Sequence, residues 1–127
     1  MKYYINKTIN ADLETVTIKI TEELQKEGFG IVTQFDVDNA LKEKLNYDFR
    51  KYRILGACNP AFALRSINTE PLIGTILPCN VMLQEVEGGI EIAIINPKIM
   101  VSDINNVEMK AIAGEIYDKM QHVIANL

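Results

Sequence analysis

The chain has 127 residues, of which 48% are hydrophobic and 24% are charged, as expected for one globular domain. Its 13 Lys and Arg residues against 17 Asp and Glu give a net charge of −4, which argues against a nucleic-acid-binding protein. With one His and two Cys, neither a two-His metal motif nor a disulfide framework can be built.

The N-terminal residues 1–10 carry Lys2 and Lys7 and contain no apolar run, so we expect no signal peptide. The strongly apolar stretches of the chain are shorter than about ten residues, too short to cross a bilayer. Two cysteines without a secretion signal indicate reduced thiols. We therefore expect a single cytoplasmic domain, residues 1–127, without a membrane partner.

The first element is a predicted strand over residues 1–8. Asn10 is the predicted cap of a helix that ends at Gly28, where glycine supplies the left-handed conformation that follows many helices. A strand is the alternative, because Val16, Ile18 and Ile20 also alternate with polar residues. Helical spacing favours the helix, and it places on one stripe Leu13, Val16, Ile20 and Leu24.

Apolar residues alternate over residues 28–37 and predict a second strand, so Gly28-Phe29-Gly30 is interpreted as a helix exit and not as a phosphate loop. Asp38 is the predicted cap of a short helix that ends at Asn46. Residues 52–57 (YRILGA) predict a third strand.

Asn59 and Pro60 form a cap and first helical residue, which predicts a helix to about Asn68. Glu70–Pro71 interrupts the chain, and a short helical turn can follow. Residues 81–86 and 90–95 flank Glu87-Gly88-Gly89, and this pattern is typical of a hairpin.

Asn96–Pro97 predicts a brief helix, and Asn105 with Glu108 has the spacing of a capping box before the final helix. The predicted order is β-α-β-α-β-α-β-β-α, an α+β domain with a mainly antiparallel sheet and helices on one face. The apolar stripe of the final helix contains Met109, Ile112, Ala113, Ile116, Met120, Val123, Ile124 and Leu127.

The candidate site consists of two Cys-Asn segments. Cys58 and Asn59 lie where a strand ends and a helix begins, while Cys79 and Asn80 open the next strand. If these strands are antiparallel neighbours, both segments lie at one end of the sheet. Free N–H groups at the helix start could lower the pKa of the Cys58 thiol. The alternative is that the cysteines pack as small apolar residues and that Asn59 only caps the helix.

Other candidate groups are weaker. His122 falls opposite the apolar stripe of the final helix, so we expect it in solvent and place no metal there. Arg50, Arg53 and Arg65 all lie near Cys58, and a guanidinium group suits a small anion. The alternative for these arginines is ion pairing with acidic residues such as Asp48 and Glu70. Packing in the core or at an interface is expected for Tyr3, Tyr4, Tyr47 and Tyr52.

Three segments carry a family resemblance: GFG at residues 28–30 leading to Asp36, YRILGACNPAFA at residues 52–63, and IGTILPCNV at residues 73–81. They resemble the domain-of-unknown-function family 302, over nearly the whole chain. The resemblance implies a compact α+β domain similar to the TATA-binding-protein-like fold. It does not imply DNA binding, because a fold does not determine a function, and it supplies no catalytic role for any residue. It favours a shared site of the ACNP and LPCN segments.

The sequence therefore leads to one main hypothesis. We expect a binding module whose site holds a small ligand, such as a small anion, or a thiophilic metal ion, with Arg53 as an added contact. Thiol/disulfide redox chemistry between Cys58 and Cys79 is the first alternative, and a homodimer with packed cysteines is the second. The site residues of the main hypothesis are Cys58, Asn59, Cys79, Asn80 and Arg53. The sequence identifies neither a cofactor nor a reaction.

Overall fold

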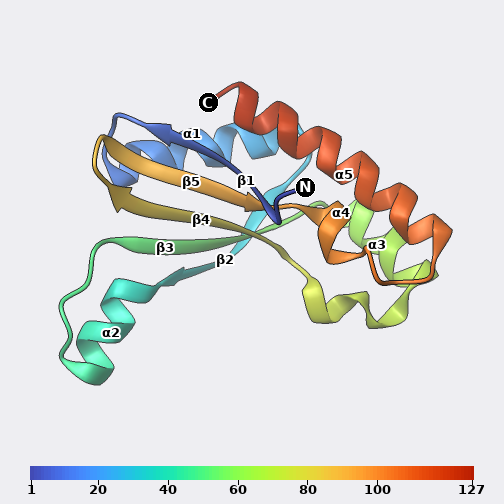
Figure 1. Cartoon of the computed structure of the whole chain (residues 1–127), viewed down its shortest axis with the longest axis horizontal. Coiled ribbons are helices and arrows are strands. Elements are labelled where there is room, and N and C mark those ends of the chain that lie inside the picture. Colours follow the sequence, from blue (N-terminus) through green and yellow to red (C-terminus); the bar gives the residue numbers. More distant parts are fainter.

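The computed structural model describes residues 1–127 and contains a five-stranded antiparallel sheet with the strand order β1-β5-β4-β3-β2 (Figure 1). The predicted α+β class and element order are confirmed, and a short 3-10 helix, η1, and the short helix α4 occupy the predicted helical turns. The strands are β1 (Tyr4–Ile9), β2 (Gly30–Asp36), β3 (Tyr52–Cys58), β4 (Cys79–Val86) and β5 (Gly89–Ile95). The helices are α1 (Leu13–Lys26), α2 (Val37–Leu45), α3 (Pro60–Thr69), η1 (Pro71–Ile76), α4 (Pro97–Met100) and α5 (Val107–Ala125).

The core lies between one face of the sheet and the helices α1 and α5. The predicted apolar stripes of both helices are buried there, and they contact the inward side chains of β3, β4 and β5. Each large apolar side chain that is fully buried contributes about 1.5–3 kcal/mol to folding. The largest of these buried side chains are Ile20, Leu24, Leu55, Leu83, Ile90, Ile92, Ile94, Ile112 and Met120.

Strand register separates the two faces of the sheet. Leu55 lies opposite Val81, and Val81 lies opposite Ile94, so these buried residues face the helices. The adjacent residues along each strand point to the other face. No helix covers that second face, which we call the open face. It is formed in the central strands by Tyr52, Ile54, Asn80, Met82, Gln84, Glu91 and Ala93.

The caps of helices α1 and α5 differ from the prediction. Asn10 does not cap α1, because Asp12 accepts a hydrogen bond from the Thr15 N–H at 2.7 Å and the helix begins at Leu13. At α5 the cap is Asn106 and not Asn105. The predicted boundaries were therefore wrong by one or two residues, although the helices were placed correctly.

The Asn106 cap is fixed by tertiary contacts. Its Oδ1 accepts from the Met109 N–H at 2.9 Å, while its Nδ2 donates to the Thr69 carbonyl at 2.9 Å and to Glu70 at 3.1 Å. Asn106 thus connects the start of α5 to the end of α3. Asn105 has no comparable set of hydrogen bonds, so it does not compete for the cap position.

The α2 cap was also predicted wrongly. Helix α2 begins one residue before Asp38, which accepts a hydrogen bond from the Tyr52 N–H at 3.2 Å instead. Asp36 occupies the cap position, yet its carboxylate makes no capping bond because Arg53 holds it. Helix α2 buries no residue and stands apart from the other helices, beyond the ends of β2 and β3 (Figure 1).

Strand β2 is less regular than its alternating sequence predicts. The register between β2 and β3 shifts between Ile31 and Thr33, which interrupts the alternation of faces. Phe29 was predicted on this strand but precedes it, and its ring lies 6.2 Å from that of Phe62 in the core. Phe35, farther along β2, remains half exposed.

The predicted hairpin between β4 and β5 is confirmed, with Gly88 and Gly89 at positive φ angles of 93° and 135°. Only glycine adopts such angles without strain, so the glycines fix the register of the hairpin. None of the helices has the length and apolar composition that crossing a bilayer requires.

Candidate functional site

The two Cys-Asn segments do meet at one end of the sheet. Strand β3 ends at Cys58 and the antiparallel strand β4 begins at Cys79, with Ala57 and Cys79 directly opposite each other. Both cysteines line a cavity of about 20 Å³, which we call the cysteine cavity. Asn59 also lines it, together with apolar residues of α3 and the loop before β4. That volume accommodates about one water molecule and no organic ligand.

Both thiols are free in this structure. Burial raises the pKa of the Cys79 thiol to about 11, and the nearby Cys58 adds to the increase because two thiolates would repel each other. At neutral pH Cys79 is therefore protonated, and a protonated thiol is a poor nucleophile and a poor metal ligand. No three His, Cys, Asp or Glu side chains form a group that could hold a metal ion.

Asn59 has a structural role in the fold. Its Oδ1 accepts from the Ala61 and Phe62 N–H groups at 3.1 and 3.3 Å and caps α3, while its Nδ2 donates to the Glu27 carbonyl at 3.3 Å. These are the N–H groups that the sequence assigned to stabilising a Cys58 thiolate. Because Asn59 uses them, they are not available to the sulfur.

Arg53 and Asn80 lie away from the cysteine cavity. Arg53 is buried on the helix-covered face, where its Nε and Nη2 donate to the two Asp36 oxygens at 2.7 and 3.2 Å. Its Nη1 also contacts Glu14 and Thr17, both at 3.1 Å. Asn80 is exposed and lies on the open face. Of the predicted site residues, the structure brings together Cys58, Asn59 and Cys79 and separates Arg53 and Asn80 from them.

We predict that Cys79 resists alkylation by iodoacetamide at neutral pH in the folded Cys58→Ser variant and reacts only after unfolding in urea. The reason is that its thiol is partly buried and protonated. Mass spectrometry of timed samples measures the reaction, and the matched Cys79→Ser variant reports on Cys58. Alkylation of Cys79 as fast as that of a free thiol would show that it is accessible and ionisable.

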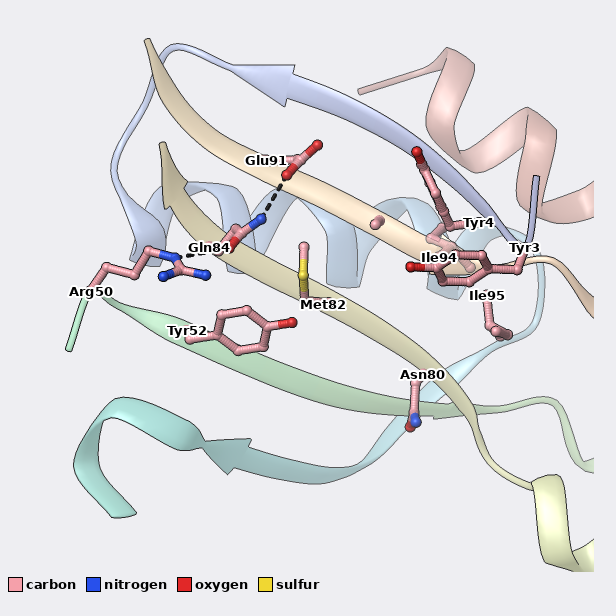
Figure 2. A pocket seen from close by; sticks show the side chains of 11 residues that line it. Tyr3, Tyr4, Arg50, Tyr52, Asn80, Met82, Gln84, Glu91, Ile94 and Ile95 are labelled. Atoms are coloured by element: carbon pink, nitrogen blue, oxygen red, sulfur yellow. Dashed lines mark hydrogen bonds between the residues drawn. The ribbon is translucent and has the colours of Figure 1, made fainter. Parts of the chain in front are cut away.

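The largest hollow of the molecule lies on the open face. A cleft of about 440 Å³ extends over β1, β3, β4 and β5, and we call it the open-face cleft (Figure 2). Its floor is a row across the sheet in which Met82 lies directly opposite Ala93. Aromatic rings flank this floor: Tyr52 on β3, and Tyr3 and Tyr4 at the other side.

A chain of polar side chains borders the cleft at one end. Arg50 Nε donates to Gln84 Oε1 at 3.0 Å, and Gln84 Nε2 donates to Glu91 Oε1 at 2.7 Å. Asn6 Nδ2 donates to the second Glu91 oxygen at 3.0 Å. Figure 2 shows Arg50 and Glu91 reaching Gln84 from two sides. The amide of Gln84 is thereby held in one orientation between a cation and an anion.

This cleft was not predicted, although the sequence carries a signal for it. In the third strand, Tyr52 and Ile54 alternate with Arg53 and Leu55, so large side chains point to both faces. A sheet with one solvated face normally shows polar residues at the outward positions. Apolar residues at those outward positions are typical of a face that contacts a ligand or another protein.

Ion pairing, the alternative that the sequence leaves for the arginines, is found for Arg53 and Arg65, with carboxylates other than Asp48 and Glu70. Arg65 pairs with Glu115 at 2.7 Å, and Arg53 pairs with Asp36, whereas Asp48 pairs with a lysine. Arg50 has no carboxylate partner within 4.0 Å. His122 is exposed as predicted, with its Nδ1 3.3 Å from Glu27.

Comparisons with known proteins agree on the family. A family model described as "Domain of unknown function DUF302" matches residues 5–127. The chain is also similar to the crystal structure of an uncharacterized conserved protein DUF302 from Bacillus stearothermophilus, with a TM-score of 0.92 and 28% sequence identity. This match covers 99% of the chain and 98% of the other protein. No curated protein matches the chain.

Proposed function

The chain belongs to the DUF302 family of domains of unknown function, and we propose that it is a binding module for a small amphipathic molecule held in the open-face cleft. The observation that carries this proposal is the concave, mostly apolar face of the sheet, bordered by oriented polar groups. The proposal keeps the binding function expected from the sequence and moves the ligand from the cysteines to the other face.

The size and lining of the cleft support a small molecule. Its volume of about 440 Å³ lies within the range of ligand sites, about 300–1,000 Å³. Met82 and Ala93 give an apolar floor, and the ring of Tyr52 offers a flat surface for stacking. Gln84 and Glu91 place fixed hydrogen-bonding groups at one end, as sites that orient a ligand do.

The cysteine cavity supports a second candidate function. Because Cys58 and Cys79 line one cavity, a soft metal ion bound by two thiolates remains a hypothesis for this end of the sheet. Disulfide formation between them is the redox alternative, in which an external disulfide takes up the two electrons and two protons that the thiols lose. Both reactions require Cys79 to lose its proton, which its raised pKa opposes. The alkylation experiment above therefore tests this candidate separately from the open-face cleft.

We predict that phenylbutanol, which combines an aromatic ring, a short alkyl chain and a neutral hydroxyl group, binds in the cleft. Replacing Met82 by Glu should weaken this binding at least tenfold, because a carboxylate on the apolar floor must be desolvated when the ring is bound. Leu64→Glu is the matched control, since Leu64 is exposed on α3 outside the cleft. Heteronuclear NMR titration gives the dissociation constants.

Equal affinity of the Met82→Glu variant and the wild type would contradict the proposal. A second copy of the chain is the rival occupant of the open face. Light scattering during size-exclusion chromatography decides that point: a stable dimer that Met82→Glu converts to a monomer, together with no binding of phenylbutanol, would replace the ligand site by an interface.

A further inference from the structure

We infer that the ligand of the open-face cleft carries a carboxylate group and that Arg50 is the residue that recognises it. The inference rests on the proposed function, and it adds the chemical class of the ligand. Arg50 is exposed at the edge of the cleft and lines it together with Tyr52 and Gln84. The other two arginines are neutralised by carboxylates, as described above.

The guanidinium group of Arg50 is held in place before any ligand binds. It lies over the Phe49 ring at 4.3 Å from the ring centre and over the Tyr52 ring at 5.7 Å. Gln84 accepts the hydrogen bond of its Nε at 3.0 Å. Stacking and this hydrogen bond reduce the side-chain entropy that binding would otherwise cost.

The remaining donors of Arg50 are free for a ligand. Its two terminal nitrogens make no hydrogen bond or salt bridge within the chain. A guanidinium group presents paired N–H donors in one plane, and that geometry matches the two oxygens of a carboxylate. Gln84 accepts from the Nε of Arg50 and from neither terminal nitrogen, so it does not compete for these donors.

The charges around the cleft favour a single negative charge on the ligand. Glu91 lines the same cleft, and its carboxylate is separated from Arg50 by the amide of Gln84. The single positive charge of Arg50 balances a monoanion, whereas a dianion such as a phosphate monoester would keep an excess negative charge and be repelled more strongly by Glu91. One other cation could bind a ligand carboxylate in place of Arg50. It is Lys2, which lies over the Tyr4 ring at 5.6 Å from the ring centre, on the opposite side of the cleft.

The test compares phenylbutyrate with phenylbutanol, which differ only in the head group. For the wild type we expect phenylbutyrate to bind about tenfold more tightly, the usual effect of a charge-assisted pair of hydrogen bonds. Arg50→Gln should remove this preference and leave the affinity for phenylbutanol almost unchanged. Arg65→Gln is the matched control and should retain the preference, because Arg65 already pairs with Glu115 outside the cleft.

The outcomes separate this inference from the proposed function. If both compounds bind the wild type equally, the carboxylate inference is wrong while the ligand site stands. If neither binds, the proposed function itself is wrong. If Lys2→Gln removes the preference and Arg50→Gln retains it, the recognition is assigned to the wrong residue.

Discussion

Replacing Gly89 with alanine is expected to lower the free energy of unfolding by about 3 kcal/mol or more, from strain at a positive φ angle and a steric clash. Gly89 has a φ of 135°, and a Cβ atom there would overlap the carbonyl oxygen of Ile9 in the neighbouring strand β1. Backbone on both sides must shift to accommodate the methyl group. The pairing of β1 with β5, and with it the edge of the open-face cleft, depends on this close approach.

Gly88→Ala is the matched control. Gly88 also has a positive φ, of 93°, but a Cβ atom there meets no other atom within 4 Å. Its replacement carries the conformational cost alone, about 1–2 kcal/mol. Urea unfolding followed by circular dichroism measures both variants. Equal destabilisation by the two substitutions would show that the contact with Ile9 is unimportant.

The second large effect is expected for Asp36→Asn, which should lower the free energy of unfolding by about 2 kcal/mol at pH 7. The substitution leaves the buried guanidinium of Arg53 with Glu14 as its only carboxylate partner. Because Asp36 also joins β2 to β3 and precedes α2, we expect the loss to spread to that helix. Asp48→Asn, which breaks an exposed pair with Lys42, should leave stability almost unchanged.

The Asp36 effect should depend on pH. The hydrogen bond from Arg53, supported by its positive charge, holds the pKa of the Asp36 carboxyl below its ordinary value of 3.8. A group whose pKa is lowered on folding stabilises the folded state above its unfolded pKa and loses this contribution as the pH falls through the folded value. The difference between wild type and Asp36→Asn should therefore be full at pH 7 and shrink below about pH 4. A difference that is the same at pH 7 and pH 3 would contradict the ion-pair explanation.

Local patterns in the sequence were sufficient to predict the elements and their order. The apolar stripe that ends at Leu127, the Gly88–Gly89 turn and the Asn59–Pro60 cap each report on residues close in the chain. The helix boundaries were less accurate where two capping residues are adjacent. Asn106 replaces Asn105 because it reaches Glu70, a contact between segments far apart in sequence.

For the candidate site, too, features set by residues close in the chain were predicted, and features set by contacts between distant segments were not. Cys58 was placed near Cys79 on the expectation that the third and fourth strands are antiparallel neighbours. The pairing of β3 with β4 confirms this expectation. The partner of Arg53 could not be predicted, because Asp36 becomes its neighbour only through the register of β2 and β3. The cleft could not be predicted either, because the sequence does not show which face of the sheet the helices leave uncovered. That face is determined by the packing of α1 and α5.

The helices and the sheet form a two-layer domain with one core, while the second face of the sheet carries the open-face cleft. The cysteine segments belong to the end of that core, where Asn59 caps α3 and Cys79 is partly buried. Asn80, from the same pair of segments, faces the other side. Neighbouring residues of these segments thus lie on opposite faces of the sheet, with Asn59 stabilising the core and Asn80 beside the proposed ligand site.

The most direct test is the residue-by-residue map of chemical shift changes in the NMR titration with phenylbutanol. We predict the largest changes at the backbone amides of Tyr52, Met82 and Ala93, around the open-face cleft. Changes centred on Cys58 and Cys79, with none at Met82, would place the ligand at the cysteine cavity and contradict the account.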